Sequence, residues 1–266
     1  MAASGPGYGL EEKVALIVDT CNDIGRQTTE SLLSLGCSVA AASFQKEKLQ
    51  EFSEVCSRKS VSKARLETFS IDRHDDKCLT ALIEKVIKSF KEMHILVNIT
   101  GTSSEDSIEN FKIEDLDKQF SENVRTPLLI TKRSSAHLVK TKGCIVNVSS
   151  IFGYRPFPQT LTYGMAMKTL IHLTSNSANE LASHGVRVNA IIPGAMDTGS
   201  QDEKDQSNPS FKKFQDYNSK CHPLGRLGSS HDYSQALLFL VSEHASFITG
   251  EILTVDGGRH VVDRDV

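Results

Sequence analysis

Two hydroxyl side chains, Ser150 and Tyr163, stand thirteen positions apart in surroundings that suit chemistry. The β-branched run 145–148 predicts a buried strand, and Ser150 follows its carboxyl end. From Tyr163 onward apolar residues recur at helical spacing, so Tyr163 lies near the start of a long helix. Because ligands bind beyond the carboxyl ends of strands in open α/β sheets, we expect both hydroxyls to meet over one pocket. A polar turn followed by a packed tyrosine is the alternative that these two residues leave open.

Strands and helices alternate along the chain around these residues. Apolar runs and helical spacing predict strands at 14–18, 38–43 and 251–255 and helices at 26–35, 113–139 and 233–241. This alternation without a linker favours one α/β domain over two. We expect this domain to span residues 11–260, between a flexible tail at 1–10 and a short tail at 261–266.

Three other stretches share one family pattern in order and spacing. Residues 94–101 read HILVNITG, residues 185–198 read GVRVNAIIPGAMDT and residues 247–258 read FITGEILTVDGG. With these stretches the chain resembles the short-chain dehydrogenase/reductase family over almost its whole length. The resemblance implies a single doubly wound parallel sheet, a Rossmann fold, with helices on both faces. It also implies NAD(P)-dependent oxidation or reduction of a small carbonyl or alcohol substrate. It also implies that Ser150 and Tyr163 flank the substrate carbonyl, and that Asn123 supports a proton-relay water.

The resemblance further implies contacts with a nicotinamide dinucleotide. The matched positions are Ile24, Gly25, Asp72, Asn98, Gly101, Pro193, Gly194 and Thr198. Asp72 matches an adenine-contacting residue, although it could instead cap the helix that begins near position 75. Thr198 matches a residue that touches the nicotinamide carboxamide. No cluster of ligands at metal-binding spacing accompanies them, so we expect no metal.

One departure from the family pattern concerns the lysine that follows the tyrosine by four positions. Position 167 is Met, and a lysine stands one residue later, at 168. A side chain four positions on lies roughly 40° around the helix from Tyr163, whereas one five positions on lies roughly 140° away. We therefore expect Lys168 to point to solvent or to a neighbouring helix, and the active-site cation to be absent.

A second departure lies in the glycine-rich turn after the first strand. The family pattern has glycine where this chain has Asp19 and Asp23, and only Gly25 remains. Carboxylates there would crowd and repel a pyrophosphate, so we expect weak binding of NADP or NAD. Asp23 has a second interpretation, as the cap of the following helix.

Cofactor preference depends on the end of the second strand. Ser43 and Phe44 stand where an aspartate would indicate NAD, and Lys46 and Lys48 follow. The absent aspartate slightly favours NADP, although the lysines could equally form a solvated helix face.

The substrate side is less informative. The insert 199–222 is polar and predicts a lid for a small polar substrate, with Tyr154, Phe157 and Pro158 as the apolar wall. The resemblance implies a homo-oligomer, such as a tetramer built on the long central helices and the last strand, or a hetero-oligomer with an active relative.

Composition excludes several other classes of protein. A net charge of −3 offers no basic surface for nucleic acid, and no apolar run is long enough for a membrane span. The amino terminus lacks the features of a signal peptide, and the six cysteines are scattered, so a cytoplasmic location is expected. The leading hypothesis is a divergent, at best weak NAD(P)-dependent reductase; the alternative is a catalytically silent family member that acts as an oligomer partner or scaffold.

Overall fold

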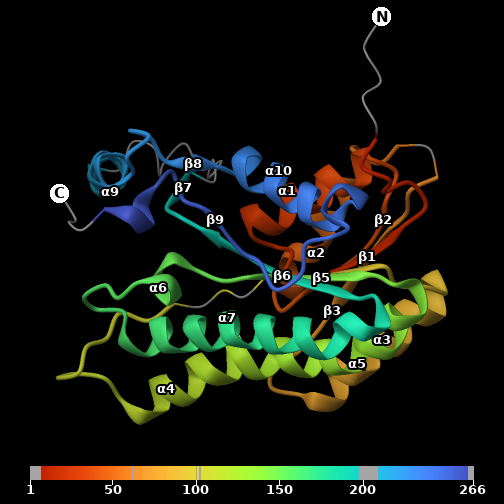
Figure 1. The fold of residues 1–266 in the computed structure, drawn as a ribbon, viewed down its shortest axis with the longest axis horizontal. Coiled ribbons are helices and arrows are strands. Elements are labelled where there is room, and N and C mark those ends of the chain that lie inside the picture. Colours follow the sequence, from red (N-terminus) through yellow and green to blue (C-terminus); the bar gives the residue numbers. More distant parts are fainter. Residues whose placement is uncertain (1–6, 62, 100, 102, 198–208, 263–266) are drawn as a thin grey trace, which may run out of the picture.

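A parallel sheet of seven strands forms the centre of the protein (Figure 1). The computed structural model describes residues 7–61, 63–99, 101, 103–197 and 209–262. The strands lie in the order β3-β2-β1-β4-β5-β6-β9. Their bounds are β1 (Val14–Val18), β2 (Ser38–Ser43), β3 (Leu66–Ser70), β4 (Ile95–Ile99), β5 (Cys144–Val148), β6 (Arg187–Pro193) and β9 (Ile252–Val255). Two short strands, β7 (Met196–Asp197) and β8 (Gly228–Ser229), form a separate small sheet.

Helices cover both faces of the central sheet (Figure 1). One layer contains α1 (Asp23–Ser34), α2 (Leu49–Ser57) and α10 (Ser230–Val241); the other contains α3 (Asp76–Phe90), α5 (Thr126–Thr141) and α7 (Leu161–Leu181). Shorter helices are α4 (Ile113–Phe120), α6 (Ile151–Tyr154) and α9 (Pro209–Cys221), with a π-helical segment η2 (Ser121–Arg125) between α4 and α5. Short 3-10 turns are η1 (Lys46–Lys48), η3 (Ala182–His184), η4 (Glu243–Ala245) and η5 (Arg259–Val261).

The alternation of side chains along each strand explains the two layers. In β1, Ala15 and Ile17 pack into the core beneath α1, α2 and α10, whereas Leu16 and Val18 pack into the core beneath α3, α5 and α7. All four side chains are almost completely buried. A strand covered on both faces must be apolar throughout, which is why such strands read as continuous apolar runs. The predicted fold class is confirmed.

The order of the strands places the expected ligand crevice. From β1 the chain builds outward through β2 and β3, then returns to the other side of β1 to add β4, β5 and β6. The reversal between β1 and β4 is a topological switch point, and ligands of such sheets bind there, beyond the carboxyl ends of the strands.

Capping residues differ from the predictions at two helices. Helix α1 begins at Asp23 rather than at residue 26, because the side chain of Asn22 accepts a hydrogen bond from the Gly25 amide. The expectation that Asp23 caps this helix is therefore wrong: Asp23 lies in its first turn. Likewise Asp75, not Asp72, caps α3.

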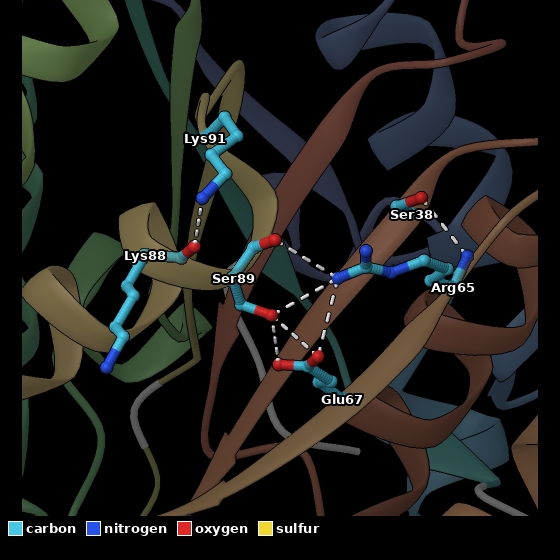
Figure 2. A network of polar contacts seen from close by, with 6 residues as sticks. All are labelled: Ser38, Arg65, Glu67, Lys88, Ser89 and Lys91. Carbon is cyan, nitrogen blue, oxygen red and sulfur yellow. Dashed lines mark hydrogen bonds and ion pairs between the residues drawn. The ribbon is translucent and has the colours of Figure 1, made fainter.

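One edge of the sheet, formed by β3, carries a polar network (Figure 2). The Glu67 carboxylate accepts hydrogen bonds from the Ser89 hydroxyl at 2.6 Å and from Arg65 at 3.4 Å. Arg65 also donates to the Ser89 hydroxyl at 3.1 Å, and its own amide donates to the Ser38 hydroxyl at 3.1 Å. Charged side chains on an edge strand discourage pairing with another chain, so this network protects the edge as well as joining β3 to the end of α3.

Candidate active site

Ser150 and Tyr163 lie together beyond the carboxyl end of β5. Ser150 caps the short helix α6, where its hydroxyl accepts a hydrogen bond from the Phe152 amide at 3.4 Å. Tyr163 lies in the first turn of α7, and its side chain is hydrogen bonded to Ser150. The structure thus brings the two predicted hydroxyls into contact.

The surroundings of Tyr163 keep its phenol protonated. Burial raises the pKa of Tyr163 above its ordinary value, and the hydrogen bond with Ser150 lowers that pKa by less. A raised pKa suits a group that donates a proton and opposes one that must accept it at neutral pH.

The Met167 side chain lies in the interior of the protein, and Lys168 lies on its surface. The Met167 side chain is fully buried. The Ser149 hydroxyl donates to the Met167 carbonyl oxygen at 3.1 Å and lies 3.8 Å from its Sδ atom. Lys168 is exposed and lines a cavity whose described lining does not include Tyr163. The helix register therefore follows the prediction that Lys168 points away from the tyrosine.

Asn123 lies in the π-helical segment η2 and is completely buried. Its amide donates to the Gln119 side-chain oxygen at 2.7 Å. The helical region predicted for 113–139 is thus interrupted by one π-helical stretch, a feature that is frequent at functional sites.

Asp19 follows β1 in a left-handed backbone conformation, with φ at 66°. A glycine adopts this conformation without strain, which is the physical reason for the glycine of the family pattern. The Asp19 side chain is buried, and its Oδ1 atom has no hydrogen-bond partner among the described residues. Burial raises the pKa of this carboxyl, the nearby Arg73 guanidinium lowers it, and Glu122 raises it.

The turn between β1 and α1 already uses one of its amide groups. The Gly25 amide donates to the Asn22 side chain at 2.8 Å, and a Cβ atom at Gly25 would lie 2.6 Å from the Thr20 backbone. Ile24 is partly buried against the core, and Asp23 forms an ion pair with Arg26 at 3.3 Å. The Gly25 amide at the amino terminus of α1 is therefore already hydrogen bonded to a side chain of the protein itself.

The other predicted cofactor residues are spread along the strand ends. The Asn98 side chain is buried, and its amide group donates a hydrogen bond to the Asn147 side-chain oxygen at 2.8 Å. Gly194, directly after Pro193, packs closely against the backbone at Asp256. A Cβ atom at Gly194 would lie 2.9 Å from the Asp256 backbone. Asp72 is exposed and accepts a hydrogen bond from the His74 amide at 2.9 Å.

Some predicted elements fall outside the described residues. Thr198 and residues 199–208 of the expected lid lie there; the rest of the insert contains α9. Gly101 is described, and its Cα faces the Asp19 carboxylate, since a Cβ atom on it would lie 3.1 Å from Oδ2.

Sequence reasoning missed a cluster of side chains beside Asp19. The Arg73 guanidinium lies 4.0 Å from the centre of the Phe44 ring and 2.9 Å from the Glu122 carboxylate. Together with Asp19 and the end of β4 these residues enclose a cavity of only about 10 Å³. Arg73 and Glu122 are far apart in the chain, so no spacing rule could have paired them; Phe44 at the end of β2 was the only available signal.

The predicted apolar wall lies on a different cavity. Tyr154, Phe157 and Pro158 line a space of about 520 Å³ together with Met165 and Lys168. The described lining of this space includes neither Ser150 nor Tyr163. It is therefore not the space over the two hydroxyls.

The described part of the chain also bears on membrane and metal-binding classes of protein. No helix there is long and apolar enough to cross a membrane. Within the same residues, no group of three or more His, Cys, Asp or Glu side chains is placed to hold a metal ion.

Comparison with known families identifies the fold and chemistry class. A family model described as enoyl-(acyl carrier protein) reductase matches residues 20–260. The chain belongs to the short-chain dehydrogenase/reductase family. Members of this family are oxidoreductases that generally use NAD(P).

Individual relatives extend over nearly the whole chain. A 3-oxoacyl-(acyl-carrier-protein) reductase from Thermotoga maritima is 28% identical over 94% of this chain and 98% of that protein. A 7alpha-hydroxysteroid dehydrogenase from Paraclostridium sordellii is 30% identical over 95% of this chain and 93% of that protein. The crystal structure of Cj0485 dehydrogenase superposes with a TM-score of 0.87 at 27% identity, covering 97% of this chain and 98% of that chain.

Proposed function

We propose that this chain is a catalytically silent member of the short-chain dehydrogenase/reductase family that acts as a subunit in an oligomer, either with itself or with an active relative. The observation that supports this proposal is the buried Met167 side chain at the lysine position of the family pattern. A free tyrosine has a pKa of about 10, so it needs a nearby cation to act as a base at neutral pH.

Lys168, the residue after Met167, does not supply this cation to Tyr163. Lys168 is exposed and lies on the outer cavity, so its ammonium group does not reach the phenol. Burial adds to the difficulty, because it raises the pKa of Tyr163 further. Oxidation of an alcohol requires the tyrosine to take up a proton. We therefore expect the rate of oxidation to be lowered more than the rate of carbonyl reduction.

A weak NAD(P)-dependent reductase of a small carbonyl compound is the second candidate. The hydrogen bond between Ser150 and Tyr163 favours it, because a protonated phenol held beside a serine can still donate to a carbonyl oxygen. The relatives named above act in their own right as reductases or dehydrogenases of acyl and steroid substrates. Lys46 and Lys48, both exposed at the end of β2, slightly favour NADP for this candidate.

Steady-state assays separate the two candidates. Wild-type protein is tested against a panel of small ketones and quinones with each reduced cofactor, beside Met167→Lys and the matched control Met167→Leu. We expect no turnover from wild type or Met167→Leu, and at most slow carbonyl reduction from Met167→Lys, because the lysine restores the cation but leaves the cofactor site unchanged. Turnover by the wild-type protein would replace the silent-subunit proposal with the reductase.

Sedimentation tests the oligomeric part of the proposal. Large apolar side chains are exposed on the outer helices, among them Ile113, Leu128 and Met165. Such side chains, on α4, α5 and α7, are candidates for a surface at which subunits associate. We expect a dimer or tetramer at micromolar concentration; a stable monomer would count against it.

A further inference from the structure

We infer that the chain fills its own adenosine pocket with four side chains, Asp19, Phe44, Arg73 and Glu122, hereafter the pocket plug. This inference deepens the proposed function and rests on it in one respect: a silent subunit has no need of a bound dinucleotide. It concerns binding rather than turnover, so each can fail without the other.

The position of the pocket plug follows from the topology. In a doubly wound sheet the adenosine half of a dinucleotide lies beyond the carboxyl ends of the strands, beside the switch point and the end of the second strand. Asp19 follows β1, Phe44 follows β2, Arg73 follows β3, and Glu122 reaches the same place from η2. Four separate elements thus contribute one side chain each to the space that an adenosine would use.

The pocket plug leaves no room for a ligand. The remaining cavity of about 10 Å³ is at the lower limit for a single water molecule, which needs roughly 10–15 Å³. Two of its members are largely buried: the Glu122 side chain is 5% exposed and that of Arg73 is 16% exposed. The residues present therefore do not fit the adenosine of NAD or NADP.

Charge adds to the exclusion by volume. The Arg73 guanidinium is held by the Glu122 carboxylate at 2.9 Å and stacks on the Phe44 ring at 4.0 Å. Arginine over an aromatic face with a carboxylate partner is a satisfied arrangement, so a ligand must disrupt it to enter. The Asp19 carboxyl lies beside this pair and would meet the phosphates of an entering nucleotide.

ADP-ribose is the appropriate probe, because it contains the adenosine and pyrophosphate of the cofactor but no nicotinamide. We expect wild-type protein to show no heat of binding and no rise in melting temperature with 1 mM ADP-ribose or its 2′-phosphate. For comparison, a ligand at 100 times its Kd would stabilise the protein by about 2.7 kcal/mol. Micromolar binding to the wild-type protein would overturn the inference.

A variant in which pocket-plug side chains are shortened should bind ADP-ribose. In Asp19→Gly/Arg73→Ser/Glu122→Ala both members of the ion pair are removed together, so neither charge is left alone in the interior. We expect at least a tenfold gain in affinity for ADP-ribose over wild type. The matched control is Arg65→Ser/Glu67→Ala, which removes an exposed Arg–Glu pair from the edge of the same sheet and should change nothing (Figure 2).

Two further outcomes complete the test. A folded triple variant that still fails to bind ADP-ribose overturns the inference. If the triple variant does not fold, Phe44→Ala is tested in its place, because it opens the pocket without removing a charge. We expect the same gain in affinity for ADP-ribose. Folded Phe44→Ala protein without this gain would refute the pocket plug. Turnover by a wild-type protein that does not bind ADP-ribose would refute the silent-subunit proposal alone.

Discussion

Replacement of Asp19 should stabilise the protein at neutral pH. Asp19 combines a left-handed backbone, with φ at 66°, and a buried carboxylate whose Oδ1 atom has no hydrogen-bond partner among the described residues. Asp19→Gly removes the carboxylate and relieves the strain of this backbone conformation. Relief of the backbone contributes about 0.5–1 kcal/mol once the greater unfolded-state entropy of glycine is subtracted.

The buried carboxylate contributes the larger part of the expected effect. An unsatisfied buried polar group costs about 1–3 kcal/mol. The attraction between Asp19 and Arg73 offsets some of this cost, so we expect a net stabilisation of about 1–2 kcal/mol. For a protein of this size that corresponds to a rise of roughly 2–8 °C in melting temperature.

The pH dependence separates the carboxylate from the backbone, and Asp19→Asn is the variant that does so because asparagine tolerates the same conformation. The pKa of Asp19 is raised in the folded protein above its ordinary value of 3.8, so the folded state holds the proton more tightly than the unfolded state. Its contribution therefore favours folding at low pH and is lost as the pH rises from that ordinary value through the raised one. The stabilisation by Asp19→Asn should be larger at pH 7 than at pH 4.

Urea unfolding at fixed protein concentration measures these differences. Asp23→Gly is the matched control in the same turn: Asp23 is helical and paired with Arg26, so glycine there should destabilise by about 1 kcal/mol. If Asp19→Gly and Asp19→Asn both lower the stability at pH 7, the Asp19 carboxylate is held by a net favourable attraction to Arg73 and our reasoning about its burial is wrong.

Three further substitutions test other parts of the structure. Gly153→Ala should destabilise by about 1–3 kcal/mol in urea unfolding, since a Cβ atom there would lie 2.6 Å from the Met167 backbone; stability equal to wild type would show that α6 can move away from α7. Lys168→Ala should change stability by less than about 0.5 kcal/mol and leave any activity of Met167→Lys intact, whereas loss of an existing wild-type activity would place Lys168 in the active site. Ser89→Ala should weaken the network with Glu67 by no more than about 1 kcal/mol, with a smaller effect in 1 M salt, as thermal melting at both salt concentrations can measure.

Local patterns in the chain were sufficient for several strands of the sheet and for the meeting of Ser150 with Tyr163. The strands at 14–18 and 38–43 have the predicted bounds, because strands buried on both faces must be apolar along their whole length. The outward direction of Lys168 also followed from the chain alone, since the angle between helix positions four and five apart is a property of every α-helix.

Only the tertiary structure decided how the crevice is filled. Which residue caps a helix depends on the side chain that reaches the free amide, and here Asn22 does so in place of Asp23. The pairing of Arg73 with Glu122 depends on the loop after β3 and the segment η2, which the fold brings together across 49 positions of sequence. The sequence determined which groups the crevice has. Long-range packing determined that Arg73 pairs with Glu122, because a buried charge needs an opposite charge close to it in space, whatever their separation along the chain.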